Sequence, residues 1–148
     1  MIPEKKILLA MIVLVFAGLR AYAQVSPGDQ IKGIWLTENK DGKVEIFRTG
    51  NTWSGKLIWG NSVLDDKGNP KHDIYNPDPK LRLRFLQGMV IITGLVYEDG
   101  KWQNGKIYNS LSGKTYNITV TVKGDNLELR GYIGIPLFGK TTVWQRIN

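Results

Sequence analysis

Apolar side chains in the chain after residue 23 recur at every second position, which is the period of a β-strand with one buried face. The alternation is clearest at 114–123, where apolar residues from Tyr116 to Val122 alternate with asparagine and threonine. Helical periodicity is nearly absent. The pattern predicts eight strands, at residues 31–37, 43–49, 52–59, 88–98, 102–109, 114–123, 126–133 and 139–147.

Short turn sequences separate most of these strands. They are Asp41-Gly42, Gly50-Asn51, Asp99-Gly100, Ser112-Gly113 and Gly124-Asp125, whose glycine, asparagine and aspartate residues tolerate the positive φ of tight hairpins. Consecutive antiparallel strands can pair both sheet edges by closing into a barrel. We therefore predict an all-β fold, an eight-stranded antiparallel up-and-down barrel, with a two-sheet sandwich as the alternative.

The long segment at 60–87 departs from this pattern. It is rich in aspartate, asparagine, proline and glycine, and a non-strand segment of this length in a compact domain is usually functional or disordered. Asp78 followed by Pro79 fits the start of a helix, because proline suits the first helical position. We expect a long loop with one helical turn at 79–83.

The first 23 residues have the order of a secretory signal peptide. Glu4, Lys5 and Lys6 precede an apolar run from Ile7 to Leu19, and the small residues of Ala21-Tyr22-Ala23 fit a cleavage site. The run is shorter than the roughly 20 residues that a membrane-spanning helix needs. The sequence thus predicts a signal peptide at 1–23 and a single mature domain at 24–148. It also predicts export to the periplasm or the extracellular space, with no membrane span after cleavage.

Composition narrows the chemistry further. The chain has no cysteine, so disulfides and thiolate metal sites are excluded. Loss of residues 1–23 lowers the net charge from +7 to +5, and the remaining cations are scattered, which disfavours a nucleic-acid partner. His72 is the only histidine, and no nucleophile motif accompanies it. We predict no metal, no cofactor and no catalytic residue.

Two segments at opposite ends of the predicted barrel sequence resemble the lipocalin and calycin pattern. They are Gly33-Ile34-Trp35 and Trp144-Gln145-Arg146. The resemblance implies that the first-strand tryptophan packs under an arginine from the last strand. A guanidinium over an indole face stabilises by about 0.5–2 kcal/mol. Trp35, Trp144 and Arg146 are therefore expected to be structural residues.

Five further blocks, at 76–84, 105–108, 113–116, 129–134 and 137–141, resemble in this order the bacterial domain-of-unknown-function family 2147. That resemblance implies a secreted or periplasmic domain of calycin-like fold. The sequence departs from the family at Asn109-Ser110, where Asp-Pro is usual. A tyrosine–aspartate pair at Tyr108 would lack its carboxylate here, which disfavours an enzyme.

The residues predicted to bind a ligand are polar groups of the long loop and of the strands that face it. Arginine forks bind carboxylates and phosphates bidentately. The alternative is that these arginines pair with Asp73, Asp78 or Glu128 and pin the loop. Simple alternation places Arg130 and Tyr132 opposite Leu127 and Leu129, on the outer face, unless Gly131 forms a bulge. The predicted set is Arg82, Arg84, Arg130, Tyr108, Tyr132 and Asp78.

The favoured function is a binding module for a small amphiphilic or anionic ligand, held in the barrel mouth beneath the long loop. The alternative is a structural or interaction protein with a filled barrel. Cavity volume separates the two, since ligand pockets begin at about 300 Å³.

Overall fold

The computed structural model describes residues 25–148. The predicted signal peptide and its cleavage before Gln24 lie outside the described residues, so both stay predictions. No helix in the described part is long and apolar enough to span a membrane.

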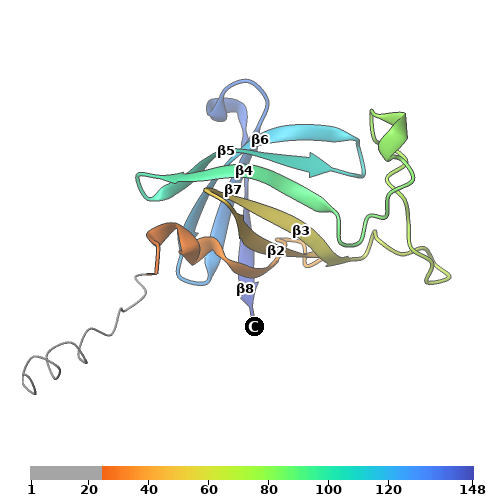
Figure 1. The fold of residues 1–148 in the computed structure, drawn as a ribbon, viewed down its shortest axis with the longest axis horizontal. Helices are drawn as coiled ribbons and strands as arrows, with labels where there is room; N and C mark the ends of the chain where they lie inside the picture. Colours follow the sequence, from red (N-terminus) through yellow and green to blue (C-terminus); the bar gives the residue numbers. More distant parts are fainter. Residues whose placement is uncertain (1–24) are drawn as a thin grey trace, which may run out of the picture.

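The described chain forms a closed barrel of eight antiparallel strands, each paired with its neighbours in sequence (Figure 1). The predicted up-and-down barrel is confirmed. The strands are β1 (Gly33–Leu36), β2 (Gly42–Thr49), β3 (Thr52–Gly60), β4 (Val90–Glu98), β5 (Lys101–Asn109), β6 (Lys114–Lys123), β7 (Asn126–Tyr132) and β8 (Lys140–Ile147). Three short 3₁₀ helices accompany them: η1 (Pro27–Ile31), η2 (Pro79–Leu81) and η3 (Pro136–Phe138).

The barrel closes where the first strand meets the last. Trp35 of β1 is paired with Val44 of β2 on one side and with Arg146 of β8 on the other. The prediction that the first strand starts at residue 31 is wrong, because Ile31 ends η1 and the strand begins at Gly33. Pro27 at the first helical position accounts for this helix, since proline suits that position.

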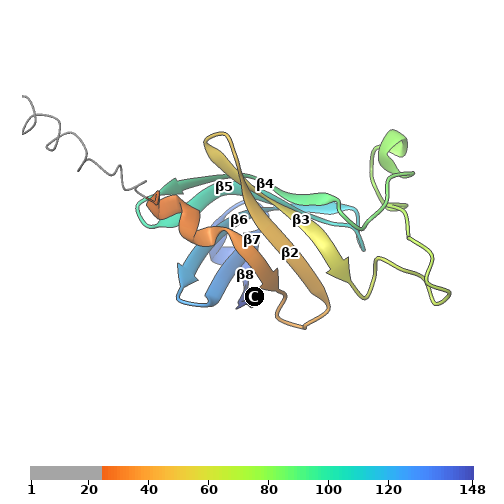
Figure 2. The same cartoon turned by 60° about the horizontal axis from the view of Figure 1, so that its bottom comes forward.

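One end of the barrel is closed by η1, opposite the long loop (Figure 2). Three tryptophan indoles from the barrel wall donate hydrogen bonds to it. Trp35 Nε1 bonds the Ile31 carbonyl at 2.8 Å, and Trp102 Nε1 bonds the Gly28 carbonyl at 3.0 Å. Trp53 Nε1 reaches the Asp29 carboxylate at 3.3 Å. The large rings and their satisfied polar atoms make this end a filled core.

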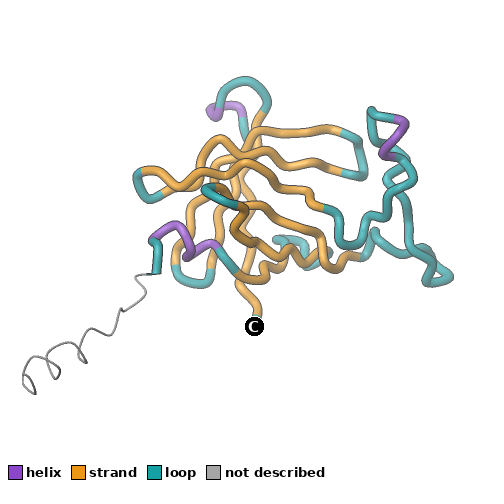
Figure 3. Tube along the Cα trace, in the orientation of Figure 1, coloured by secondary structure: helices purple, strands orange, loops and turns teal. Residues whose placement is uncertain are grey.

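Residues 61–89, between β3 and β4, form the long connection at the opposite end of the barrel (Figure 3). Isolated bridges link Leu64 to Pro70 and His72 to Phe85, so the segment has internal structure. Val63, Leu86 and Met89 are buried in the main core. The sequence predicts a loop at 60–87, where the connection spans 61–89, and the helical turn predicted at 79–83 is present as the shorter η2.

Candidate functional site

A cavity of about 340 Å³ lies at the end of the barrel that η1 does not close. Its wall combines inward-facing strand residues with the β1–β2 and β5–β6 turns and the start of the long connection. Val44, Leu57 and Trp144 belong to the buried core and line the cavity from below. The apolar lining is Val44, Leu57, Ile91, Ile107, Leu111 and Trp144. The barrel is thus half filled and half open.

The rim of this cavity is polar and nearly uncharged. Hydroxyl and amide groups come from Thr37, Asn61, Ser62, Asn109, Ser110, Tyr108 and Tyr116. Among the described residues of the lining, only Asp41 carries a charged side chain. Thr37 Oγ1 donates to the Asp41 carboxylate at 2.6 Å and accepts from the Gly42 amide at 2.9 Å. These bonds fix the β1–β2 turn at the edge of the opening.

Next to the cavity, the long connection is fastened to the barrel through the buried carboxylate of Asp73, which is 0% exposed. Tyr108 of β5 donates its phenol proton to Asp73 Oδ1 at 2.6 Å. Arg84 Nε and Nη2 both lie 2.9 Å from Asp73 Oδ2, and Asn76 Nδ2 donates to the same oxygen at 2.8 Å. A charge buried without partners is costly, and here both carboxylate oxygens are satisfied.

Tyr108 links the hydrogen-bond network of Asp73 to the cavity. It lines both the cavity and an outer groove of about 270 Å³ that Arg84 and Lys106 also line. Burial, reinforced by the hydrogen bond to Asp73, raises the pKa of Tyr108 from 10.0 to about 12, while the nearby charge of Arg84 lowers it. The phenol therefore keeps its proton to well above neutral pH, and that proton is donated to Asp73.

Arg82 and Asp78 form hydrogen bonds within the long connection and fix its conformation. Arg82 Nε donates to the Asn76 carbonyl at 2.8 Å, and its side chain is otherwise exposed. The Asp78 side chain accepts from the Lys80 amide at 3.0 Å, which is the N-cap of η2 that the sequence predicts. Both residues shape the loop, and neither lines the cavity.

Arg130 and Tyr132 lie on the outer face of the barrel, as simple alternation predicts, because β6 and β7 pair without a bulge at Gly131. Arg130 bonds the Pro136 carbonyl at 2.7 Å and Thr141 Oγ1 at 2.9 Å. The structure thus brings Arg84 and Tyr108 together and places Arg130 and Tyr132 elsewhere. A ligand-binding role for these residues stays a prediction.

The guanidinium of Arg146 lies 4.2 Å from the centre of the Trp35 ring, as the sequence predicts. Its Nη1 and Nη2 each donate at 2.6 Å, to the carbonyls of Lys32 and Gln30. Arg146 therefore binds the backbone around η1 to the last strand and closes the barrel end. Trp144, two residues earlier, is buried and lies at the floor of the cavity.

Comparison with known proteins agrees with this architecture. Residues 33–146 match the family described as uncharacterized proteins conserved in bacteria, DUF2147. The chain belongs to the DUF2147 family. Its structure is similar to that of protein HP1028 from the human pathogen Helicobacter pylori, which is described as belonging to the lipocalin family. The TM-score is 0.70 at 30% sequence identity, covering 80% of this chain and 83% of that one. Among curated proteins there is no match.

In this member of DUF2147, sequence reasoning missed most of the cavity rim. Thr37, Asp41, Asn61 and Ser62 lie in turns that look like ordinary surface loops, and no local signal distinguishes them. From the sequence, Asp73 is predicted only as an ion-pair partner of the arginines. Its complete burial and its bond to Tyr108, 35 residues away, follow from the tertiary fold alone.

Proposed function

We propose that this DUF2147 domain binds a small, mostly apolar ligand with a neutral polar end in the open half of its barrel. The observation that carries the proposal is the cavity of about 340 Å³ above an otherwise filled core. This volume is at the lower end of the range for ligand pockets, so the ligand is small. The described lipocalin-family relative supports a binding role for the same kind of barrel.

The rim chemistry favours a neutral head group over an anionic one. An anion at the opening would face the carboxylate of Asp41, whereas Arg84 is already paired with Asp73. Hydroxyl and amide groups such as those of Ser62 and Asn109 both donate and accept hydrogen bonds. An aliphatic alcohol small enough for this volume, or a similar neutral amphiphile, fits this arrangement.

A pair of tryptophan variants tests the proposal. Ile107→Trp fills the cavity, whereas Val143→Trp adds the same side chain to the outer face of β8, where Val143 is 39% exposed. Displacement of an environment-sensitive dye by a fatty alcohol should show binding to the parent and to Val143→Trp. Ile107→Trp should bind about tenfold more weakly or worse, which corresponds to a loss of about 1.4 kcal/mol.

Two results would contradict the proposal. If the fatty alcohol binds neither the parent nor Val143→Trp, the cavity is not a site for a neutral amphiphile, and a structural or interaction role is favoured instead. If the fatty acid of the same chain length binds more tightly and Arg84→Ala abolishes that preference, the ligand is anionic and the arginine prediction is correct.

A further inference from the structure

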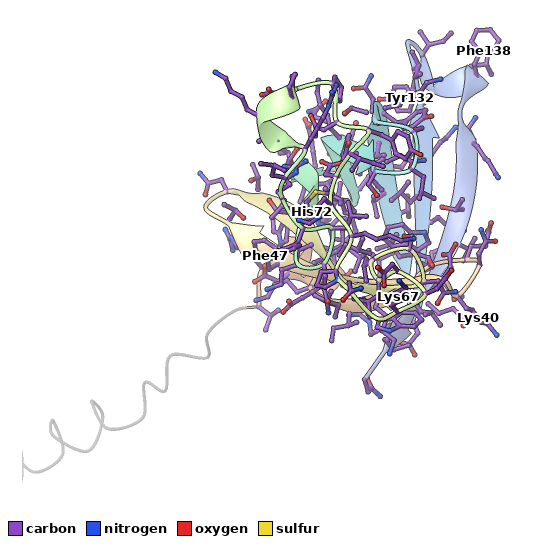
Figure 4. The ribbon with its side chains drawn as sticks, turned by 90° about the vertical axis from the view of Figure 1, so that its right-hand side faces the viewer. Lys40, Phe47, Lys67, His72, Tyr132 and Phe138 are labelled. Atoms are coloured by element: carbon purple, nitrogen blue, oxygen red, sulfur yellow. The ribbon has the colours of Figure 1, made fainter. Side chains whose placement is uncertain are left out.

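The connection between β7 and β8 carries four exposed apolar side chains within six residues. Ile133, Ile135, Leu137 and Phe138 are exposed by 67%, 53%, 75% and 80%. We call these four residues the apolar tip. Figure 4 shows the Phe138 ring standing clear of the rest of the molecule, with Tyr132 nearer the barrel. Side chains of this kind seldom gather on the surface of a soluble domain without a partner.

The backbone of the apolar tip is held from below by Arg130. This residue donates from Nε to the Pro136 carbonyl at 2.7 Å and from Nη2 to the Leu137 carbonyl at 3.2 Å. Backbone bonds from Gly139 to Pro136 and from Phe138 to Ile135, at 3.0 and 3.3 Å, tighten the turn. Because these carbonyls have partners within the protein, their transfer out of water costs less than it would for an open loop.

Positive charge surrounds the base of the apolar tip. Lys140 is exposed and paired in register with Gly131, next to Arg130. Lys101 lines the same surface depression as Arg130 and Pro136. Within residues 25–148, no carboxylate forms an ion pair with Arg130 or Lys140, and Glu128 in that depression bonds Lys123 at 3.0 Å.

We propose that the apolar tip inserts into the surface of an anionic phospholipid bilayer. The apolar side chains of this narrow protrusion can enter the boundary of the acyl chains, and the cations at its base can bind lipid phosphates. Tyr132 lies between them, at the level where aromatic residues contact the head groups. A stable protein partner needs a surface of about 800 Å² on each side, which a four-residue knob does not offer. The exposed Leu83 and Phe85 of the long connection, by contrast, are interrupted by arginines.

Vesicle co-sedimentation of residues 24–148 tests this assignment. The parent should bind vesicles of phosphatidylglycerol with phosphatidylethanolamine and bind phosphatidylcholine vesicles more weakly. Leu137→Ser with Phe138→Ser should reduce partitioning about tenfold or more, because two large apolar side chains no longer leave water. Lys140→Gln should weaken binding about fivefold, and only to the anionic vesicles.

Matched controls come from the long connection. Leu83, 82% exposed, is as accessible as Phe138, and Leu83→Ser should leave vesicle binding unchanged. Lys67→Gln removes an exposed lysine far from Phe138 in Figure 4 and should also have no effect. Circular dichroism melts verify that each variant folds. Parent-like vesicle binding by the folded tip variant would overturn the proposal, as would an equal loss in Leu83→Ser. The proposal would also be overturned if the parent bound neither kind of vesicle. In that case the apolar tip would be assigned to a protein partner instead.

Discussion

Replacing Arg146 with alanine should strongly destabilise the barrel, because this side chain links the last strand to the backbone around η1. The variant loses two charge-assisted hydrogen bonds at 2.6 Å and the stacking on Trp35 at 4.2 Å. Hydrogen bonds to charged groups contribute about 1.5–3 kcal/mol each, and the cation–π contact about 0.5–2 kcal/mol.

These contributions are not fully additive, and the Arg146 side chain is 25% exposed, so water compensates for part of the loss. We expect the free energy of unfolding to fall by about 3–4 kcal/mol, a large share of the 5–15 kcal/mol typical of a domain. Arg146→Lys keeps the charge and loses the planar fork, so its loss should be smaller and still clear.

Arg48 provides the control, since it also lies over a tryptophan ring, that of Trp53 at 5.3 Å, with its side chain 41% exposed. Arg48→Ala should cost less than about 1 kcal/mol, as exposed charge interactions do. Urea unfolding followed by circular dichroism measures each variant. A double-mutant cycle with Trp35→Phe should give a coupling of about 1 kcal/mol or more, and strict additivity would mean that the ring and the guanidinium do not interact. A loss in Arg146→Ala no larger than in Arg48→Ala would refute the reasoning.

Two further predictions concern the fastening of the long connection. Because the pKa of Tyr108 is raised from 10.0 to about 12 in the folded state, the phenol proton stabilises the fold below pH 10, and that stabilisation is lost as pH rises toward 12. Unfolding free energies across this window should therefore fall more steeply in the parent than in Tyr108→Phe, and parallel curves would contradict the burial of the phenol. Gly113, with φ +70°, lies where an added Cβ would collide with the Tyr75 carbonyl, whereas Gly124, with φ +61°, has open space around it. Amide hydrogen exchange at residues 73–76 should accelerate in Gly113→Ala and stay unchanged in Gly124→Ala, and equal exchange in the two variants would show that the turn does not hold the loop.

The architecture was predictable because its signals are local. Alternation in β6 and a glycine turn at Gly124 determine a hairpin from a few neighbouring residues, and eight consecutive antiparallel strands close most simply as a barrel. The predicted start of β1 at residue 31 is wrong because apolar Ile31 continues the strand pattern, although Pro27 indicates a helix start.

The candidate site was less predictable, since it depends on distant contacts. Leu57 and Trp35 follow the same inward pattern, yet one lines an open cavity and the other fills the core. Only the packing of η1 against the tryptophans decides which half is filled. In the same way, the arginines of the long connection predict the binding of an anionic ligand. In the structure, however, Arg84 pairs with a carboxylate of the same chain, that of Asp73.

The seam between β1 and β8 also determines the order in which this barrel can form. The other seven pairings join strands that are neighbours in sequence, six of them through short turns and β3 with β4 through the connection at 61–89, while the pairing of Trp35 with Arg146 joins the two ends of the described chain. A polypeptide that emerges N-terminus first must therefore hold β1 and β7 as unpaired edges until β8 arrives. During that interval it is an open sheet that a second chain can join. Arg146 lies on β8, the strand whose pairing with β1 and β7 covers both exposed edges.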